Sequence, residues 1–397
     1  MTWNWEQPEW PDFTYDSTAL GPLEQQFLRQ AGEFVGAYKH IGADEQQTLK
    51  IELISEEAVK TSEIEGEILN RDSVQSSLRA QLGLGAEAPN VKPAERGISK
   101  MMVDLYRNYA DALSDQALFD WHTMLLAGDK EIKVIGGYRT HADAMQVVSG
   151  PIHKRTVHFE APPSARVPNE MKRFVAWFNA TAPGGRKALP TLTRAALAHL
   201  HFVCIHPFED GNGRIGRALA EKALAQNLGH PTLIALAYTI ERKRKDYYAA
   251  LERNNKELHI DGWMKYFADT VLKAQDNTIK RVDATSPRPS SMRNSASNST
   301  NARPKVIRPR VQGGHRRLQG RPGTDNYISI SKTSRATATR DLQDLVEKGA
   351  LTKVGELRYT RYFVNINERS ESWRGFCSRS KLRKRPRIKD SHHTSSR

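Results

Sequence analysis

Residues 206–217 read His-Pro-Phe-Glu-Asp-Gly-Asn-Gly-Arg-Ile-Gly-Arg. This stretch places a base, two carboxylates, glycines and two arginines within twelve residues. Gly211 and Gly213 bracket Asn212 directly before an amphipathic run, so we expect a tight turn that leads into a helix N-terminus. The free N–H groups of such a terminus bind anions. The stretch therefore predicts a phosphate site.

The charged residues of the stretch support that interpretation. Arg214 and Arg217 lie three residues apart on one face of the first helical turn, where cations are unfavourable unless an anion binds nearby. A di- or triphosphate would meet that need. Asp210 supplies a hard oxygen ligand of the kind that holds Mg²⁺ beside phosphates. His206, with an ordinary pKa of about 6.5, is a candidate general base.

Taken separately, these features have ordinary explanations, since Gly-Asn-Gly often forms a hairpin turn and His-Pro a loop corner. Together they resemble the signature of the Fic family: His-Pro-Phe, one variable residue, Asp or Glu, Gly-Asn-Gly-Arg, two variable residues and Arg. Every fixed position is met in residues 206–217. The resemblance implies a mainly α-helical protein with a Fic-type catalytic domain and a β-hairpin flap.

The resemblance also implies a reaction. Fic proteins mostly transfer AMP from ATP to a hydroxyl side chain of a protein, and pyrophosphate leaves. ATP and Mg²⁺ are thus the implied substrate and cofactor, and the implied partner is a protein with a Ser, Thr or Tyr hydroxyl, a second copy of this chain included. Such a displacement needs positioning and charge neutralisation more than covalent catalysis by the enzyme.

Each position of the loop takes a role from the same resemblance. His206 is implied as the general base, Phe208 as an apolar anchor, and Asp210 as the Mg²⁺ ligand. The nucleotide phosphates are implied to bind Gly211, Asn212, Gly213, Arg214 and Arg217.

Two further assignments concern residues outside the loop. Residues 239–257 resemble the helix that follows the active-site helix in the family, so Tyr248 and Asn254 are assigned to the nucleotide base; ordinary core packing is the alternative. His122, within a predicted helix at 115–126, is interpreted as a structural histidine.

Other functions stay open at this point. Removal of AMP, or transfer of another phosphate-linked group, fits the same signature, because the signature describes a phosphate site more than a reaction. Outside the enzyme class, the alternative is a DNA-binding regulator with a vestigial or sensory nucleotide site. The intact His206, Asp210 and Arg217 favour an enzyme.

Residues 61–66 read Thr-Ser-Glu-Ile-Glu-Gly, and Gly66 suits the position just past a helix C-terminus. Alone, the pattern predicts an acidic end of a surface helix. Beside the loop, it resembles the inhibitory motif of Fic proteins: Ser or Thr, three variable residues, Glu, then Gly or Asn. The resemblance implies that Glu65 pairs with Arg217 and that Thr61 fixes the helix against the nucleotide site.

Two other regions point to local structure. The start of the chain is rich in tryptophan and interrupted by prolines, so we expect an aromatic arm that packs on the body; it resembles an N-terminal extension found on some Fic proteins. Residues 134–163 hold two β-prone runs around a polar connection. They predict a hairpin, which in the family is a flap that pairs with the backbone of the target.

Apolar spacing and capping residues predict the helices. They are expected over about 45–65, from a cap at Asp72 or Ser73 to Leu82, over about 94–113, over 115–126 after an N-cap at Ser114, and from Thr191 or Thr193 to the residue before His206.

Composition bounds the setting of the protein. The chain has 397 residues and only two cysteines, Cys204 and Cys377, so neither a disulfide framework nor a zinc set is expected. The sequence shows no signal-like start and no long apolar run, which predicts a soluble, cytoplasmic protein without a membrane partner. Of the net charge of +15, residues 286–323 carry +9 and residues 374–397 carry +8, which leaves −2 for the rest.

The C-terminal third differs in character. Residues 334–348 have helical spacing, and two β-prone runs flank Gly355-Glu356, an order that resembles a winged helix. Arg335, Thr337 and Arg340 lie off the apolar face and are candidates for DNA backbone contacts; a solvated face is the alternative. The helices that should precede them are missing from residues 286–323, which is either a native basic linker or an altered reading frame.

The sequence therefore predicts five segments and leaves a homodimer open. They are 1–95, the aromatic arm and inhibitory helices; 96–275, the catalytic domain; 276–323, a basic low-complexity linker; 324–367, a winged-helix-like unit; and 368–397, a basic tail.

Overall fold

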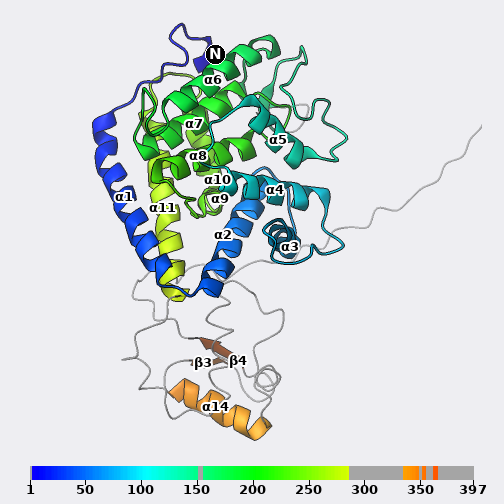
Figure 1. The fold of residues 1–397 in the computed structure, drawn as a ribbon, viewed down its shortest axis with the longest axis vertical. Coiled ribbons are helices and arrows are strands. Elements are labelled where there is room, and N and C mark those ends of the chain that lie inside the picture. Colours follow the sequence, from blue (N-terminus) through cyan, green and yellow to red (C-terminus); the bar gives the residue numbers. More distant parts are fainter. Residues whose placement is uncertain (1, 151–154, 286–333, 348–350, 355–360, 365–397) are drawn as a thin grey trace, which may run out of the picture. The chain divides into compact units, whose positions relative to one another are not determined.

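The computed structural model describes residues 2–150, 155–285, 334–347, 351–354 and 361–364, and the chain divides into two compact units, 1–287 and 288–397. The first unit is mainly helical (Figure 1), as predicted. Its elements are η1 (Asn4–Glu6), α1 (Ser17–Lys39), α2 (Ala43–Ile64), α3 (Arg71–Gln81), α4 (Pro93–Arg107), α5 (Asp115–Leu126), β1 (Gln146–Ser149), β2 (Thr156–Glu160), η3 (Ser164–Arg166), α6 (Val167–Ala180), α7 (Thr191–Ile205), α8 (Asn212–Leu228), α9 (Leu236–Glu241), α10 (Arg244–Arg253) and α11 (Asp261–Thr285).

Helices α7 and α8 form the centre of this unit (Figure 1). Every residue of α7 except Val203 is buried. Apolar and small residues lie on nearly all sides of the helix rather than along one stripe, and three larger polar side chains are buried with them, those of Arg194, His199 and His201. Helix α8 packs against α7 and is buried over most of its length. The loop 206–211 joins these two helices, and a rigid core therefore holds it at both ends.

Helix α7 is capped from another part of the chain. Glu24 of α1 accepts hydrogen bonds from the backbone N–H groups of Leu192 (3.0 Å) and Thr193 (2.8 Å) and from the Thr193 hydroxyl (3.1 Å). The predicted cap by Thr191 or Thr193 is wrong, because this buried carboxylate satisfies the free N–H groups and suits the positive end of the helix dipole.

The other helices follow the predicted pattern, with three differences. Asn70, rather than Asp72 or Ser73, caps α3 by accepting from the backbone of Ser73 (3.0 Å). Helix α4 ends at Arg107, earlier than expected. The stretch 239–257 is not continuous, because α9 ends before Arg242 and α10 begins at Arg244.

Two predicted helix boundaries agree with the structure. Helix α2 ends at Ile64 and is followed by Gly66 with φ of +91°, a conformation that glycine adopts without strain. The Ser114 hydroxyl caps α5 by accepting from the backbone of Ala117 (3.2 Å).

Strands β1 and β2 form the predicted hairpin. They pair antiparallel, with Gln146 opposite Glu160 and Ser149 opposite Thr156, and a bulge falls between Val147 and Val148. The hairpin turn at 151–154 lies outside the described residues.

The aromatic arm packs on the body, as expected. Trp3, Trp5 and Trp10 are buried. Farther along the arm, Thr14 forms a parallel β-bridge with His259. The arm is therefore part of the folded unit.

The second unit contains α14 (Arg335–Glu347), β3 (Leu351–Val354) and β4 (Arg361–Val364), of which the strands pair antiparallel. Ala338 and Leu342 are buried on the apolar face of the helix, and Arg340 is exposed. The predicted helix and hairpin are thus present, whereas the side chains of Arg335 and Thr337 and all of 286–323 lie outside the described residues. Within the described part of the chain, no helix combines the length and the apolar character of a membrane span.

Candidate active site

His206 lies in a turn that one buried arginine fixes. Its backbone is left-handed, with φ of +52°, a conformation that costs a non-glycine residue about 1 kcal/mol or more. Arg139 holds the turn, since its Nε donates to the His206 carbonyl (2.8 Å) and its backbone N–H donates to the Pro207 carbonyl (2.9 Å). The guanidinium also donates to the Ser164 hydroxyl (2.8 Å). The sequence had assigned Arg139 no role.

The ring of His206 is neutral at pH 7 and has one free acceptor nitrogen. Burial lowers its pKa to about 4, and the nearby Arg139 adds to that effect, so the imidazole is neutral at pH 7. Nδ1 lies 3.2 Å from the Val203 carbonyl, a contact that requires a proton on Nδ1. Nε2 is then the free acceptor.

Phe208 anchors the loop, as the sequence implied. Its side chain is fully buried and stacks on His122 with ring centroids 4.2 Å apart. Burial lowers the pKa of His122 to about 4, and its Nδ1 accepts from the backbone of Gly136 (3.0 Å). His122 therefore occupies the structural position predicted for it.

Asn212 closes the loop on itself. Its amide oxygen accepts from the Phe208 N–H (3.0 Å), and its amide nitrogen donates to the Phe208 carbonyl (2.9 Å). Gly211 just before it has φ of +82° and starts α8. The first N–H groups of α8 have no partner within the helix, so a phosphate cradle here would be built from the backbone, while the Asn212 side chain keeps its shape.

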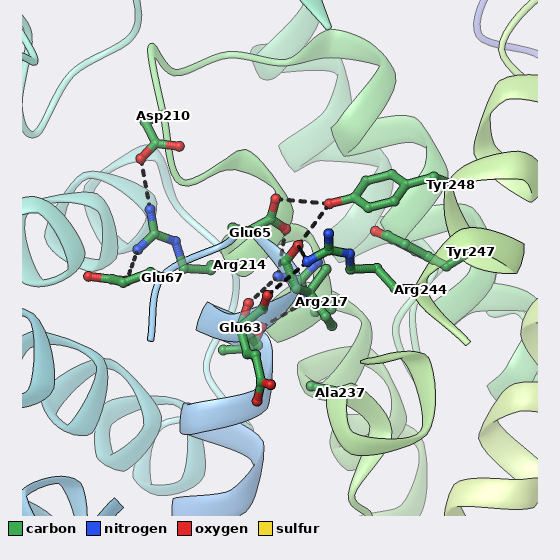
Figure 2. Close-up of polar contacts among 12 residues, drawn as sticks. Glu63, Glu65, Glu67, Asp210, Arg214, Arg217, Ala237, Arg244, Tyr247 and Tyr248 are labelled. Atoms are coloured by element: carbon green, nitrogen blue, oxygen red, sulfur yellow. Dashed lines mark hydrogen bonds and ion pairs between the residues drawn. The ribbon is translucent and has the colours of Figure 1, made fainter. Parts of the chain in front are cut away.

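Arg217 is bound by the end of α2, as the resemblance implied. Its Nη2 lies 2.8 Å from Glu65 Oε1, and the Arg217 side chain is 1 % exposed while that of Glu65 is 26 % exposed (Figure 2). Its Nε donates to the Thr61 hydroxyl (2.7 Å), and Nη2 also donates to the Thr61 carbonyl (2.8 Å). Nη1 is buried with no hydrogen-bond partner.

Arg214 is also paired with carboxylates. Nη1 lies 2.8 Å from Glu67 Oε2 and Nη2 lies 2.8 Å from Asp210 Oδ2 (Figure 2). The Arg214 side chain is 5 % exposed, whereas those of Glu67 and Asp210 are 36 % and 50 % exposed. Glu67 was missed in the sequence, although its place directly after Gly66 was the available signal.

Gly213 lies directly beside both charged groups of the ion pair between Glu65 and Arg217. A Cβ atom at this position would collide with Glu65 Oε1 and would lie 3.2 Å from Arg217 Nη1. The missing side chain therefore leaves space that the Glu65 carboxylate fills, beside the helix N-terminus where a phosphate is expected.

Side chains of helix α10 donate hydrogen bonds to the C-terminal end of α2. Arg244 donates to the carbonyls of Glu63 (3.3 Å) and Ile64 (3.4 Å). The Tyr248 hydroxyl lies 3.2 Å from the Ile64 carbonyl and 3.3 Å from Glu65 Oε2 (Figure 2). Burial and the Glu65 charge raise the pKa of Tyr248 to about 12, so it remains a hydrogen-bond donor.

Asn254 sits in the framework of the fold. Its amide donates to the Ala250 carbonyl (2.7 Å) and accepts from the Trp263 N–H (3.2 Å), which joins α10 to α11. The assignment of Tyr248 and Asn254 to a nucleotide base stays a prediction, since the contacts of both residues here are with the protein.

The donors around Asp210 suit a magnesium ion that is held largely by substrate. The described residues contain no group of three or more His, Cys, Asp or Glu side chains that could bind a metal. One carboxylate with phosphate oxygens and water is, however, a usual Mg²⁺ site, and half of the Asp210 side chain is open to solvent. The fit is that of a single protein ligand beside the phosphate cradle.

Most of the residues of this site fall within matches to known protein families. Residues 112–224 match the Fic/DOC family, and residues 3–84 match a domain of unknown function, DUF4172. This chain carries a Fic domain. The match spans α5 to α8, and it therefore includes His206 and both arginines of the loop.

Relatives of the Fic domain include proteins described as adenylyltransferases. A probable protein adenylyltransferase of Aquifex aeolicus (strain VF5), aq_aa38, is 34% identical over 93 residues, which are 23% of this chain and 25% of the relative. The protein adenylyltransferase Fic of Drosophila mojavensis is 36% identical over 106 residues, which are 27% of this chain and 19% of the relative. The chain thus spans a quarter or less of the length of these curated relatives.

Solved structures show the same fold. A Fic family protein from Desulfovibrio desulfuricans G20 superposes with a TM-score of 0.51 at 19% identity, over 89% of this chain and 98% of that chain. A Fic domain containing signaling protein from Bacteroides thetaiotaomicron gives a TM-score of 0.50 at 19% identity, over 65% of this chain and 97% of that chain. The predicted Fic-type helical fold is confirmed.

Proposed function

We propose that the chain is a protein adenylyltransferase that transfers AMP from ATP to a Ser, Thr or Tyr hydroxyl of a protein, and that Glu65 inhibits it by occupying Arg217. The observation that carries the proposal is that a candidate general base and a candidate phosphate site lie at the two ends of residues 206–217. A neutral His206 lies at one end, and the N-terminus of α8 with its two arginines lies at the other. The adenylyltransferase relatives of the Fic domain support the choice of reaction.

The chemical step follows from that arrangement. The acceptor hydroxyl gives its proton to His206 Nε2 while its oxygen bonds to the α-phosphorus of ATP. The bond from the α-phosphorus to the bridging oxygen breaks, and pyrophosphate leaves with the electron pair. Arg214, Arg217 and the first N–H groups of α8 stabilise the charge on the leaving phosphates. Mg²⁺ beside Asp210 would neutralise part of the same charge.

Inhibition follows from competition for one guanidinium. The Glu65 carboxylate lies 2.8 Å from Arg217 Nη2, and in this proposal Arg217 is the group that binds the terminal phosphate. ATP can bind only by displacing Glu65 or with its phosphates shifted. The second case takes the α-phosphorus out of line with the acceptor hydroxyl, which removes the rate enhancement that correct positioning provides.

Labelled ATP tests the reaction. The Glu65→Gly chain is incubated with ATP that carries the label on either the α- or the γ-phosphate, and protein-bound label is measured. Transfer of α-label alone is expected, and His206→Ala in the same background serves as the control that removes the base. Transfer of γ-label alone would mean phosphorylation, and release of AMP from a labelled acceptor would mean that the chain removes AMP by hydrolysis.

A DNA-binding regulator is the second candidate. It is favoured by the helix α14 followed by the β3–β4 hairpin, the order found in a winged helix, with Arg340 exposed on the helix. In that case the Glu65→Gly chain transfers neither label, and ATP changes DNA affinity instead.

A further inference from the structure

One edge of the β1–β2 hairpin, the outer side of β2, is occupied by hydrogen bonds from other segments. On the outer side of β2, the Glu160 carbonyl accepts from the Trp5 indole (2.7 Å) and the His158 carbonyl accepts from the Asn255 side chain (3.0 Å). These bonds take the carbonyl groups that a further strand would need. A further strand on this side would have to displace these two bonds.

The other edge of the hairpin is open. All four residues of β1, Gln146–Ser149, are exposed, and among the described residues no backbone group of another segment pairs with the outer side of β1. An unpaired edge is a template for an extended peptide, which adds a strand through main-chain hydrogen bonds.

The N-terminal arm is attached to the occupied edge at several points. Trp3 packs edge-on against Phe159, with ring centroids 5.4 Å apart. The backbone N–H of Asn4 donates to the Asn255 carbonyl (3.0 Å), so Asn255 holds the arm with its backbone and the hairpin with its side chain. The arm, β2 and Asn255 are therefore joined to one another by packing and hydrogen bonds.

The same arm reaches the helix that presents the base. The Asn4 side chain donates to Cys204 Sγ (3.2 Å), two residues before His206. Burial raises the pKa of Cys204 to about 12, so the sulfur stays a neutral thiol and this contact is constant with pH. One short segment thus contacts both the hairpin and the end of α7.

We propose that residues 3–5 of the arm are positioning residues for the protein acceptor. They fix the hairpin so that only β1 can pair with an extended acceptor segment, and they set the distance from that segment to His206. This inference rests on the proposed function, because it concerns the acceptor of the same reaction. It gives a role to the beginning of the region that matches DUF4172.

Two indole groups of the arm provide a matched test. Trp5→Phe removes the N–H that holds Glu160 and keeps an aromatic ring. Trp10→Phe removes an equivalent N–H, which donates to Glu170 of α6 (2.9 Å) and not to the hairpin. Both are made in the full chain with Glu65→Gly, and the acceptor is full-length His206→Ala chain modified in trans with α-labelled ATP.

Trp5→Phe is expected to raise the acceptor KM about fivefold, the size of effect that one lost hydrogen bond produces, with kcat and the KM for ATP unchanged. Hydrogen exchange of the amides at 156–161 should become faster in the same variant. Trp10→Phe should leave the acceptor KM and this exchange within about twofold of the parent.

Equal acceptor KM values for Trp5→Phe and Trp10→Phe would overturn the inference. So would a Trp5→Phe chain whose kcat and ATP KM change together with the acceptor KM, because that result indicates a general loss of structure. An absence of transfer in every chain, the parent and Trp10→Phe included, would overturn the proposed function itself.

Discussion

The stretch 206–217 comprises the loop 206–211 and the start of α8, and its two ends are held by different kinds of contact. At the His206 end, Arg139 binds backbone carbonyls and Asn212 binds the backbone of Phe208. None of these contacts competes with a substrate. At the other end, the arginines bind carboxylates that ATP phosphates would have to replace. In the proposed reaction, the base end is therefore built before substrate arrives, whereas ATP must displace the carboxylates at the phosphate end.

Removal of the base should have the largest effect. With Glu65→Gly as background, His206→Ala is expected to lower transfer by at least about a hundredfold, because a positioned general base contributes roughly 10²–10⁴ in rate. ATP affinity should stay within about twofold, since the phosphates bind at the other end of the loop. Transfer is followed with α-labelled ATP and affinity by calorimetry. Retained transfer would show that His206 is not the general base, and the two ends of residues 206–217 would then no longer differ in the way described.

Release of Arg217 should have the next largest effect. Glu65→Gly is expected to raise transfer at least about tenfold, which corresponds to about 1.4 kcal/mol of barrier. A shielded, charge-assisted pair can impose that much, whereas an exposed pair is worth about 0–1 kcal/mol. Rates of α-label transfer with and without the substitution give the ratio.

The control for this prediction lies two residues away from Glu65. Glu63 pairs with Lys60 and not with Arg217, so Glu63→Gly changes the same helix end but leaves the Glu65 pair. An equal rise in that variant would assign the effect to loosening of α2. An unchanged rate in Glu65→Gly, or an Arg217→Ala chain more active than the parent, would show that the pair does not inhibit.

Removal of the Glu67 charge from Arg214 should change the rate of transfer less. Glu67→Gln is expected to raise transfer by about two- to threefold, because Glu67 is 36 % exposed and Arg214 retains Asp210 as a partner. Salt should shrink the difference further, since screening weakens an exposed pair. Rates at low and high ionic strength measure it. An increase in the transfer rate as large as that of Glu65→Gly would mean that Glu67 on Arg214 inhibits transfer as strongly as Glu65 on Arg217.

The pH response of the base should be the smallest effect. With a pKa of about 4, His206 is protonated only as pH falls toward 4, so it remains a free base at pH 5.5. We expect kcat of the Glu65→Gly chain to fall less than about twofold between pH 7.5 and 5.5. A histidine with the ordinary pKa of about 6.5 would be mostly protonated at pH 5.5 and would lose about tenfold. A tenfold loss would thus indicate that the ring is hydrated rather than buried.

The sequence predicted the parts of the site that depend on local pattern. The turn at Gly211, the start of α8, the end of α2 at Ile64 and the pair between Glu65 and Arg217 all agree with the structure. The turn and the helix ends follow from neighbouring residues, and the pair follows from two short motifs in the resemblance. The helical fold could be predicted for the same reason.

The rest depends on contacts between distant residues of ordinary type. Arg139 reaches the His206 carbonyl across 67 positions, and Glu24 caps α7 across 168 and 169 positions. A lone arginine or glutamate has no period or spacing that reveals its partner, because its task is set only when the helices pack. The division into five segments and the winged-helix assignment likewise remain predictions.

The bond between Asn4 and Cys204 has a consequence for the newly made chain. It joins residues 200 positions apart, and long-range contacts of this kind form late because a long loop must close first. At a synthesis rate of about 5–20 residues per second, the arm waits roughly ten seconds or longer on the ribosome before its binding surface exists. During that time its tryptophans have no core to enter. Other partners of the arm, Asn255 and His259, are made later still, so nascent chains of this protein should depend on chaperones most strongly until residues 255–259 have emerged.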